Sequence, residues 1–349
     1  MPNSDCHLSG NGAVAALEGR LRAFYGVRHA LCVSSASTGL LAVGLALNLR
    51  RSDFVTTPYT YGATLSGWLL LGNRPLFADI DPHTLALDPE SARQWITPRT
   101  KALLAVDIHG IPSDTAALRR LADEFGIPYI ADAAQSFGAR RGGRPASIDA
   151  DALVISFTAG KTLCAGEGGA ILTNHDVLFE KLIWHTQHPQ RQRRDLGLSF
   201  SNEFALNGRI HPLAAEQANA GFDAALARLR RHQAACFDAI EELNETGSIE
   251  PICFREQGIE PTFFRLTAAW KNESMNELPG WQIELPPVDL LYRHPAFIAQ
   301  FPRRLRSAPE CPVAEDQARR RFSVVRKSAA HRFNDCGDAL VSTTAGEHR

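Results

Sequence analysis

The sequence of 349 residues has no long apolar run and almost no net charge. Its longest apolar stretches, Leu69–Leu71 and the glycine-interrupted Leu40–Leu47, fall well short of the ~18 residues that cross a bilayer. Lys and Arg together number 37 and Asp and Glu number 38, which leaves a formal charge of −1. We therefore expect neither a membrane-spanning protein nor a broad cationic surface for nucleic acid.

Paired cysteines and clustered metal ligands are also missing. The seven cysteines are odd in number and never form a Cys-x-x-Cys pair, so neither a zinc site nor a disulfide framework is expected. His185, His188 and His211 have no other ligand residues at metal-binding spacing, which predicts no metal. The N-terminus has no cationic segment followed by an apolar stretch, so the sequence predicts a cytoplasmic protein.

Short apolar runs alternate with helix-like stretches between Ala30 and Thr173. This alternation is typical of parallel strands joined by crossovers, and it predicts a doubly wound α/β sheet flanked by helices. Several runs are apolar throughout, as expected for strands covered on both faces. The predicted strands are His29–Val33, Phe54–Thr57, Pro75–Ala78, Ala102–Ile108, Tyr129–Ala131, Leu153–Phe157 and Ala170–Leu172.

The pattern changes after about residue 225. A long amphipathic helix is predicted from about Pro212 to His232, and the spacing beyond it is irregular and richer in Pro and Arg. The length alone favours two domains. We therefore predict a large domain over residues 1–225 and a smaller α+β domain over residues 226–349, with a disordered tail from about Asn334.

Ligands of doubly wound sheets bind beyond the carboxyl ends of the strands, so residues just after each strand are candidates for chemistry. Lys161 follows the strand Leu153–Phe157 and precedes a Gly-Glu-Gly-Gly turn at residues 166–169. Burial at that edge disfavours the ammonium and makes a neutral, nucleophilic amine accessible. The alternative is a solvated loop lysine.

Further strand ends carry polar or aromatic side chains. Asp132 can keep a proton on a basic ring nitrogen of a cofactor, or it can cap the turn that follows. The hydroxyls of residues 34–38 precede an apolar helix whose N-terminus favours a phosphate, although such a run also serves as an ordinary N-cap. Ser156 would add a hydroxyl to that phosphate, and Tyr61 can stack on a flat ring or pack in the interior.

Two long motifs stand on neighbouring strand ends. One is Asp-Ala-Ala-Gln-x-x-Gly-Ala at residues 132–139, and the other is Ser-Phe-x-x-x-Lys-x-Leu-x-x-Gly-Glu-Gly-Gly at residues 156–169. Through them the sequence resembles the DegT/DnrJ/EryC1/StrS family of sugar aminotransferases, which depend on pyridoxal phosphate (PLP). The resemblance covers roughly residues 9–225 and, more faintly, residues 311–315. It implies fold type I: a mostly parallel mixed sheet flanked by helices, with a smaller C-terminal domain.

The resemblance also implies roles for individual residues. Lys161 would be the Schiff-base lysine, Asp132 the partner of the pyridine nitrogen, and Gln135 a partner of the ring 3-hydroxyl. The phosphate-binding and ring-stacking positions are matched by Ser37, Thr38 and Ser156 and by Tyr61, respectively. Asn207 matches an asparagine that reaches the phosphate of the neighbouring subunit, which implies a homodimer. The alternative for Asn207 is an Asx turn.

A member of this family would move an amino group from glutamate or glutamine to a keto sugar, a nucleotide-linked keto sugar or a cyclitol. Such a reaction would serve the biosynthesis of a secondary metabolite, such as an antibiotic, or of a surface polysaccharide. Two alternatives remain open. One is a PLP-dependent sugar dehydratase of the same family, against which Lys161 argues because those relatives carry histidine there. The other is a PLP-binding regulatory protein without turnover.

Three segments depart from the family pattern. Ala36-Ser37 stand where Gly-Thr is usual, so the phosphate turn has lost its glycine. Val106-Asp107-Ile108-His109 replaces a Val-His-Leu strand end, and Pro189 follows His188 where the family often has glycine. The C-terminal part is short and matches poorly, so the sequence does not identify the keto acceptor.

Overall fold

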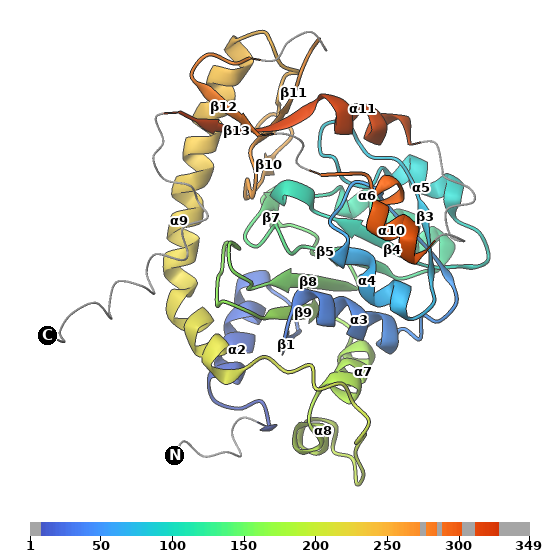
Figure 1. Cartoon of the computed structure of the whole chain (residues 1–349). Helices are drawn as coiled ribbons and strands as arrows, with labels where there is room; N and C mark the ends of the chain where they lie inside the picture. The colour runs from blue at the N-terminus through green and yellow to red at the C-terminus, as the bar shows by residue number, and fades with distance from the viewer. Residues whose placement is uncertain (1–7, 273–276, 285–287, 302–310, 328–349) are drawn as a thin grey trace, which may run out of the picture.

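A seven-stranded sheet forms the centre of the computed structural model, which describes residues 8–272, 277–284, 288–301 and 311–327 (Figure 1). The strand order is β1-β9-β8-β5-β4-β2-β3. Each strand overlaps one of the predicted strands, which confirms the α/β fold class. In chain order they are β1 (His29–Val33), β2 (Asp53–Thr56), β3 (Arg74–Phe77), β4 (Thr100–Val106), β5 (Tyr129–Asp132), β8 (Ala152–Ser156) and β9 (Gly169–Thr173).

One strand departs from the prediction of parallel crossovers. β9 runs antiparallel to both of its neighbours, β1 and β8, whereas the other pairings in the sheet are parallel. The parallel reading of Ala170–Leu172 was therefore wrong. The reason is local: a loop without a helix joins β8 to β9, and such a connection reverses the chain instead of crossing the sheet. This loop carries Lys161 at the carboxyl end of β8.

Helices cover both faces of the sheet (Figure 1). On one face Leu40, Trp68 and Leu182 pack against apolar strand residues, and on the other Leu17 and Leu121 do so. The strands are consequently buried on both sides, as their uniformly apolar sequences predicted. The helices of the first face are α3 (Ala36–Ala46), α4 (Ala63–Leu70) and α7 (Asp176–Thr186), and those of the second are α2 (Ala13–Tyr25), α5 (Pro89–Trp95) and α6 (Thr115–Phe125).

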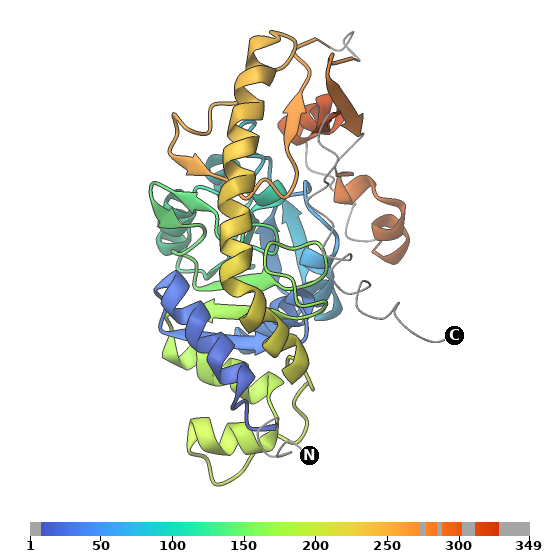
Figure 2. The ribbon, with the colours of Figure 1, turned by 90° about the vertical axis from the view of Figure 1, so that its left-hand side faces the viewer.

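Helix α9 (Pro212–Glu245) is 34 residues long and continues well past the predicted end near His232. Figure 2 shows it as a single rod that runs alongside the sheet and reaches the C-terminal elements. Phe222 in its first half packs in the core shared with α2, and Leu243 in its second half packs in a separate C-terminal core. The helix crosses position 225 without a break. Neither α9 nor any other described helix is both long and apolar enough to cross a membrane.

The C-terminal elements form a small antiparallel sheet and two helices that return to the central sheet. The backbone N–H groups of Val313 and Ala314, at the start of α11 (Pro312–Arg320), donate to the carboxylate of Asp79 at 2.9 and 2.8 Å, which holds α11 against the loop after β3. The predicted tail from about Asn334 lies outside the described residues. The elements are β11 (Thr267–Ala269), β12 (Trp281–Glu284) and β13 (Arg321–Arg326), α10 (Pro295–Gln300) and α11 (Pro312–Arg320), and β10 (Ile259–Glu260), which pairs with the hairpin of β6 (Arg140–Arg141) and β7 (Arg144–Pro145).

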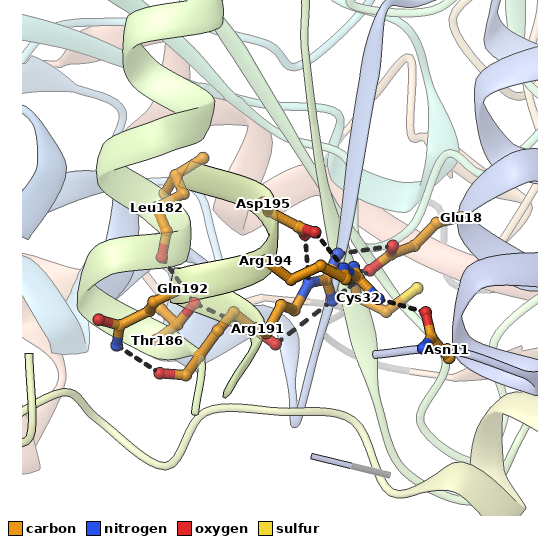
Figure 3. A network of polar contacts seen from close by, with 10 residues as sticks. Asn11, Glu18, Cys32, Leu182, Thr186, Arg191, Gln192, Arg194 and Asp195 are labelled. Atoms are coloured by element: carbon orange, nitrogen blue, oxygen red, sulfur yellow. Dashed lines mark hydrogen bonds and ion pairs between the residues drawn. The ribbon is translucent and has the colours of Figure 1, made fainter. Parts of the chain in front are cut away.

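A buried ion pair joins α2 to α8 (Pro189–Leu196) (Figure 3). The guanidinium of Arg191 donates to Glu18 at 2.8 and 3.0 Å and to Asp195 at 3.1 Å. Glu18 also accepts from the backbone N–H of Cys32 in β1 at 2.9 Å. Arg191 is buried, but its charge is compensated by two carboxylates, so the network fastens α8 to α2 and β1.

Candidate active site

A cavity of about 890 Å³ opens beyond the carboxyl ends of β2, β4, β5 and β8. Its lining residues between positions 60 and 161, here called the sheet wall, include Tyr61, Gln135 and Lys161. Its lining residues between positions 264 and 301, here called the C-terminal wall, include Phe264 and Arg265. The cavity therefore lies at the carboxyl ends of the strands, where ligands of such sheets bind. Part of its lining, however, comes from residues 264–301, which are far from the strands in the sequence.

Lys161 projects from the loop after β8 into this cavity. Its Nζ atom lies 4.3 Å from the centre of the Phe264 ring, a cation–π distance. Burial lowers the pKa of Lys161, and the negative charge of Asp132 opposes that shift. The lysine is therefore not the solvated loop residue of the alternative interpretation. Because its pKa is lowered, a larger fraction of its amine is neutral than in a surface lysine.

Asp132 ends β5 and is 6% exposed. One carboxylate oxygen accepts from the Thr64 hydroxyl at 2.7 Å, and the other accepts from the backbone N–H of Ala134 at 3.0 Å. Burial raises the pKa of Asp132, while these two donors and the charge of Lys161 act in the opposite direction. The carboxylate keeps lone pairs for a further donor, because each oxygen has only one protein partner in the described structure.

Gln135 connects the two walls. Its side-chain Oε1 accepts from the backbone N–H of His109 at 2.7 Å, which leaves the amide NH₂ to donate elsewhere. Its backbone oxygen accepts from the Thr262 hydroxyl at 2.6 Å. Gly110 permits this close approach, because a Cβ on it would lie 1.9 Å from the Thr262 oxygen. The segment that leads into the C-terminal wall is thus bonded directly to the sheet wall.

The hydroxyl run at residues 34–38 forms the N-terminus of α3. Ser35 is the N-cap, and its Oγ accepts from the backbone N–H of Thr38 at 3.1 Å. The hydroxyls of Ser34 and Ser35 each lie 3.0 Å from the Thr38 hydroxyl. Ser37 precedes Thr38 in the sequence and lies in the first turn of α3, where backbone N–H groups without helical partners can bind an anion.

Ser156 is brought beside this helix end by the sheet. It pairs with Gly169 in the ladder of β8 and β9, and Ser35 bridges to Gly168. Gly169 is needed here, because a Cβ on it would lie 2.8 Å from the backbone nitrogen of Ala36. Ser37, Thr38 and Ser156 therefore form one hydroxyl-rich edge, outside the lining of the cavity itself.

Tyr61 and Asn207 are both exposed. Tyr61 is 72% exposed at the cavity, whereas Tyr59 two residues earlier is fully buried, so the interior-packing alternative applies to Tyr59 and not to Tyr61. Asn207 does not line the cavity of its own chain. Its neighbour Gly208 accepts from the backbone N–H of Ser34 at 2.8 Å, which places the Asn207 loop next to the hydroxyl-rich edge.

At the altered strand end, residues 106–109, Asp107 is buried away from the cavity and His109 lines it. Asp107 is buried and does not line the cavity; its carboxylate accepts from the hydroxyls of Ser113, Ser136 and Ser147 at 2.7–2.8 Å. His109 lines the cavity with its backbone in the left-handed region, at φ 57°. The departure from the family pattern therefore changes the cavity through His109 rather than through Asp107.

A model of the DegT/DnrJ/EryC1/StrS aminotransferase family matches residues 3–327. The chain belongs to this family. A relative from Pseudomonas aeruginosa, UDP-2-acetamido-2-deoxy-3-oxo-D-glucuronate aminotransferase, is 40% identical over 182 residues, which are 52% of this chain and 51% of the relative. The matched part therefore spans about half the length of that protein.

Two solved structures share the fold of this chain. S. venezuelae DesV, solved in complex with a ketimine intermediate, superposes with a TM-score of 0.77 at 26% identity, covering 93% of this chain and 86% of DesV. DesI, solved in the presence of its TDP-sugar product, superposes with a TM-score of 0.73 at 26% identity, covering 93% and 82%. Fold type I, expected from the two motifs, is thereby confirmed.

The residues around the cavity fit PLP, the cofactor on which this family depends. Asp132 has acceptor capacity for a ring N–H, Gln135 has a free amide donor, and Lys161 supplies an amine. The hydroxyls and helix amides at the start of α3 suit a phosphate. An acid, an amine and an anion site of this kind are what the cofactor requires.

Three residues at this site were not identified from the sequence. Thr64 holds Asp132, and its only signal was its place shortly after the Tyr61 strand end. Phe264 covers the Lys161 amine, and Arg265 adds a cation to the cavity. Phe264 and Arg265 follow an irregular segment without a motif. Their aromatic and cationic side chains were therefore the only signal in the sequence that could have indicated a place at the site.

Proposed function

We propose that this chain is a PLP-dependent aminotransferase that moves an amino group from glutamate or glutamine to a keto group on a sugar, a nucleotide-linked sugar or a cyclitol. The observation that carries the proposal is the shared placement of Lys161 and Gln135 on one cavity, within electrostatic reach of the buried Asp132. Similarity to a UDP-keto-sugar aminotransferase and to DesI supports a nucleotide-linked sugar as the acceptor.

Each part of PLP would be bound by different residues around the cavity. When bound, PLP supplies an electron sink for the carbon that exchanges the amino group. Asp132 would keep the ring nitrogen protonated, and Gln135 would donate to the ring hydroxyl. The phosphate would be held by Ser37, Thr38 and Ser156, and Tyr61 would cover the ring.

Lys161 carries the proton transfers in this proposal. Its neutral amine would hold the carbonyl carbon of the cofactor until the amine of the donor displaces it. The freed nitrogen could then take a proton from the donor's α-carbon and release it again. Burial favours the neutral form, while Asp132 and the Phe264 ring favour the charged form. These opposing influences keep both protonation states accessible, as a group that both accepts and donates a proton requires.

Lys161→Ala tests the proposal directly. We expect the visible absorbance of covalently held PLP to disappear and amino transfer to fall by about 10⁴-fold, the upper range for removing a proton-transfer group. The matched control is Lys181→Ala on the exposed side of α7, which should behave as wild type. An undiminished visible band in Lys161→Ala, or turnover within tenfold of wild type, would contradict the assignment.

We also propose that the active protein is a homodimer in which Asn207 serves the partner's site. Large apolar side chains surround this residue in the sequence and are exposed in the single chain: Phe200 is 64%, Phe204 97% and Leu213 67% exposed. Exposed apolar groups gathered in this way are typical of a surface that another protein covers. Phe204→Ser should therefore increase the monomer fraction in size-exclusion chromatography with light scattering.

Subunit mixing tests the role of Asn207. Asn207→Asp, which brings a negative charge to a phosphate site, and Lys161→Ala are each expected to be nearly inactive alone. If Asn207 serves the partner, a mixed dimer holds one site with both defects and one intact site, so mixing the two variants restores up to half of the wild-type activity per mixed dimer. If Asn207 acts in its own chain, every site retains one defect and mixing restores nothing.

A further inference from the structure

The C-terminal wall carries a positive charge that the proposed amino transfer does not use. Arg265 lines the cavity and is exposed there, next to Phe264, whose ring covers the Lys161 amine. Within the described part of the chain its guanidinium has no carboxylate within ion-pair distance. Its backbone N–H donates to His109 at 3.5 Å, so the arginine is anchored where the two walls meet.

His109 presents an unused hydrogen-bonding atom at the same junction. It is 1% exposed, and its buried Nε2 has no hydrogen-bond partner in the described structure. Burial, followed by the charges of Arg321 and Arg265, lowers the pKa of His109 to about 3, so the ring is neutral at ordinary pH. A neutral imidazole with a proton on Nε2 donates one hydrogen bond, and a buried donor without a partner is costly.

A second arginine lies behind His109. Arg321, at the start of β13, is buried. Within the described part of the chain it donates only to neutral oxygens: Gln317 at 2.8 Å, Thr267 at 3.2 Å and the backbone of Pro82 at 3.4 Å. Burial lowers its pKa to about 10. The nearby hydroxyl of Tyr59 is also buried without a partner, and the ring packs edge-on against His109 at 5.9 Å.

Acidic groups do not neutralise this region. Asp289 is the one carboxylate among the described lining residues, and no ion pair joins it to Arg265. Glu250 and Asp316 act on Arg321 from a distance, but both are bonded to Arg320. The junction of the walls therefore combines one exposed guanidinium, one buried guanidinium and one unsatisfied imidazole donor without a local counter-charge.

We propose that the junction of Arg265 and His109 is a binding site for a carboxylate group of the substrate. Arg265 can offer two parallel N–H groups that match the two carboxylate oxygens. In the tautomer with its proton on Nε2, His109 would add a third donor once the carboxylate displaces the side chains that cover this atom. Arg321 contributes its field from behind without contact. This inference rests on the proposed function, because it places the carboxylate on a substrate whose reacting group faces Lys161. The carboxylate belongs either to the amino donor or to an acidic keto sugar.

Two pairs of unreactive probes separate these sources. Glutarate and its diamide mimic the donor with and without carboxylates, and UDP-glucuronate and UDP-glucose mimic the acceptor with and without one. None carries an amino or keto group for transfer, so binding to the PLP-loaded protein is measured by calorimetry without turnover. The variants are Arg265→Gln and His109→Leu, and the matched control is Arg231→Gln on the exposed side of α9.

We expect Arg265→Gln to weaken binding of the carboxylate member of one pair by about 10- to 100-fold, the range for losing a charged hydrogen bond. The affinity for the neutral member of that pair should change less than threefold. His109→Leu should also weaken binding of the carboxylate member selectively, but by a smaller factor than Arg265→Gln. An effect on glutarate identifies the donor, and an effect on UDP-glucuronate identifies the acceptor.

The inference is overturned if Arg265→Gln changes both members of each pair alike, or if wild type binds neither carboxylate probe. Failure of the proposed function looks different. In that case wild type transfers no amino group from any donor, or Lys161→Ala transfers it as well as wild type, whatever the probe binding shows.

Discussion

The two walls of the cavity are built by different means. On the sheet wall and directly behind it, the key polar groups follow strand ends and have protein partners. Gln135, in the wall, is bonded to His109, and Asp132, buried behind it, is bonded to Thr64 and Ala134. On the C-terminal wall Arg265 projects from an irregular segment without a carboxylate partner in the described structure. Under the proposed function, the cofactor would therefore be held by residues fixed at strand ends, whereas the substrate would be recognised by an irregular segment of the kind that tolerates sequence change.

Asp132→Asn should have the largest effect and should affect every substrate. The amide oxygen can still accept from the backbone N–H of Ala134, and the amide NH₂ can donate to the Thr64 hydroxyl, so the fold is kept. The neutral amide, however, cannot hold a proton on a ring nitrogen. We expect kcat to fall by about 10³-fold with glutamate and with glutamine alike, the scale of losing one preorganised charge. Steady-state kinetics with both donors measure this, with the exposed Asp223→Asn as the control. A loss confined to one donor would erase the distinction between the walls.

Two arginines that are buried in the described structure, Arg191 and Arg321, differ in whether a carboxylate compensates their charge, as the polar groups of the two walls do. Arg191→Met leaves Glu18 buried without its partner, so the free energy of unfolding should fall by about 3–5 kcal/mol. Arg321→Met removes a buried charge that has no carboxylate partner in the described structure, so the change should stay within about 1 kcal/mol. Urea unfolding of the two variants checks both values. Equal costs would indicate that the charge of Arg321 is compensated as fully as that of Arg191.

The sequence predicted the sheet wall because its signals are local. The strands are continuous apolar runs, and Asp132, Gln135 and Lys161 stand in motifs directly after them, so their common edge follows from the parallel order. The antiparallel course of β9 was missed, because residues 169–173 are as apolar as a parallel strand.

The C-terminal wall could not be predicted in the same way. Phe264 and Arg265 reach the cavity because α9 extends to Glu245 and because Thr262 bonds to Gln135, a contact between residues far apart in the chain. The backbone N–H of His109, a residue in the left-handed region, likewise donates to the side chain of Gln135, which lies well separated from it in the sequence. Neither contact has a periodic or motif signature.

His109 lies where the walls meet, and it predicts a pH dependence of stability. Burial, then Arg321 and Arg265, lower its pKa to about 3 in the folded protein, against about 6.5 in an unfolded chain. Between these values the unfolded state binds more protons, so the free energy of unfolding falls as the pH falls. The slope rises from about half of its limit at pH 6.5 toward about 1.4 kcal/mol per unit, so about 1.6 kcal/mol is lost between pH 6.5 and pH 5.

His109→Gln removes this titrating group and should flatten that part of the profile. Urea midpoints at pH 5.0, 5.75 and 6.5 measure the slope for wild type and variant. The exposed His83→Gln is the matched control and should keep the wild-type slope. A variant that loses as much stability on acidification as wild type would show that another group carries the dependence.

Phe264→Leu should have the smallest effect, and it tests how far the C-terminal wall influences the sheet wall. Leucine keeps an apolar cover over the Lys161 amine but removes the ring, whose attraction for an ammonium amounts to about 0.5–2 kcal/mol. The charged form of Lys161 then loses this attraction, so the pKa of the amine should fall further and the pH profile of kcat should move to lower pH by about 0.4–1.5 units. Phe264→Tyr retains the ring and should leave the profile in place.

A shift in the leucine variant alone would mean that the two walls are not independent, because Phe264 of the C-terminal wall would influence the protonation of Lys161 in the sheet wall. An equal shift in both variants would instead assign the effect to packing and leave the walls separate.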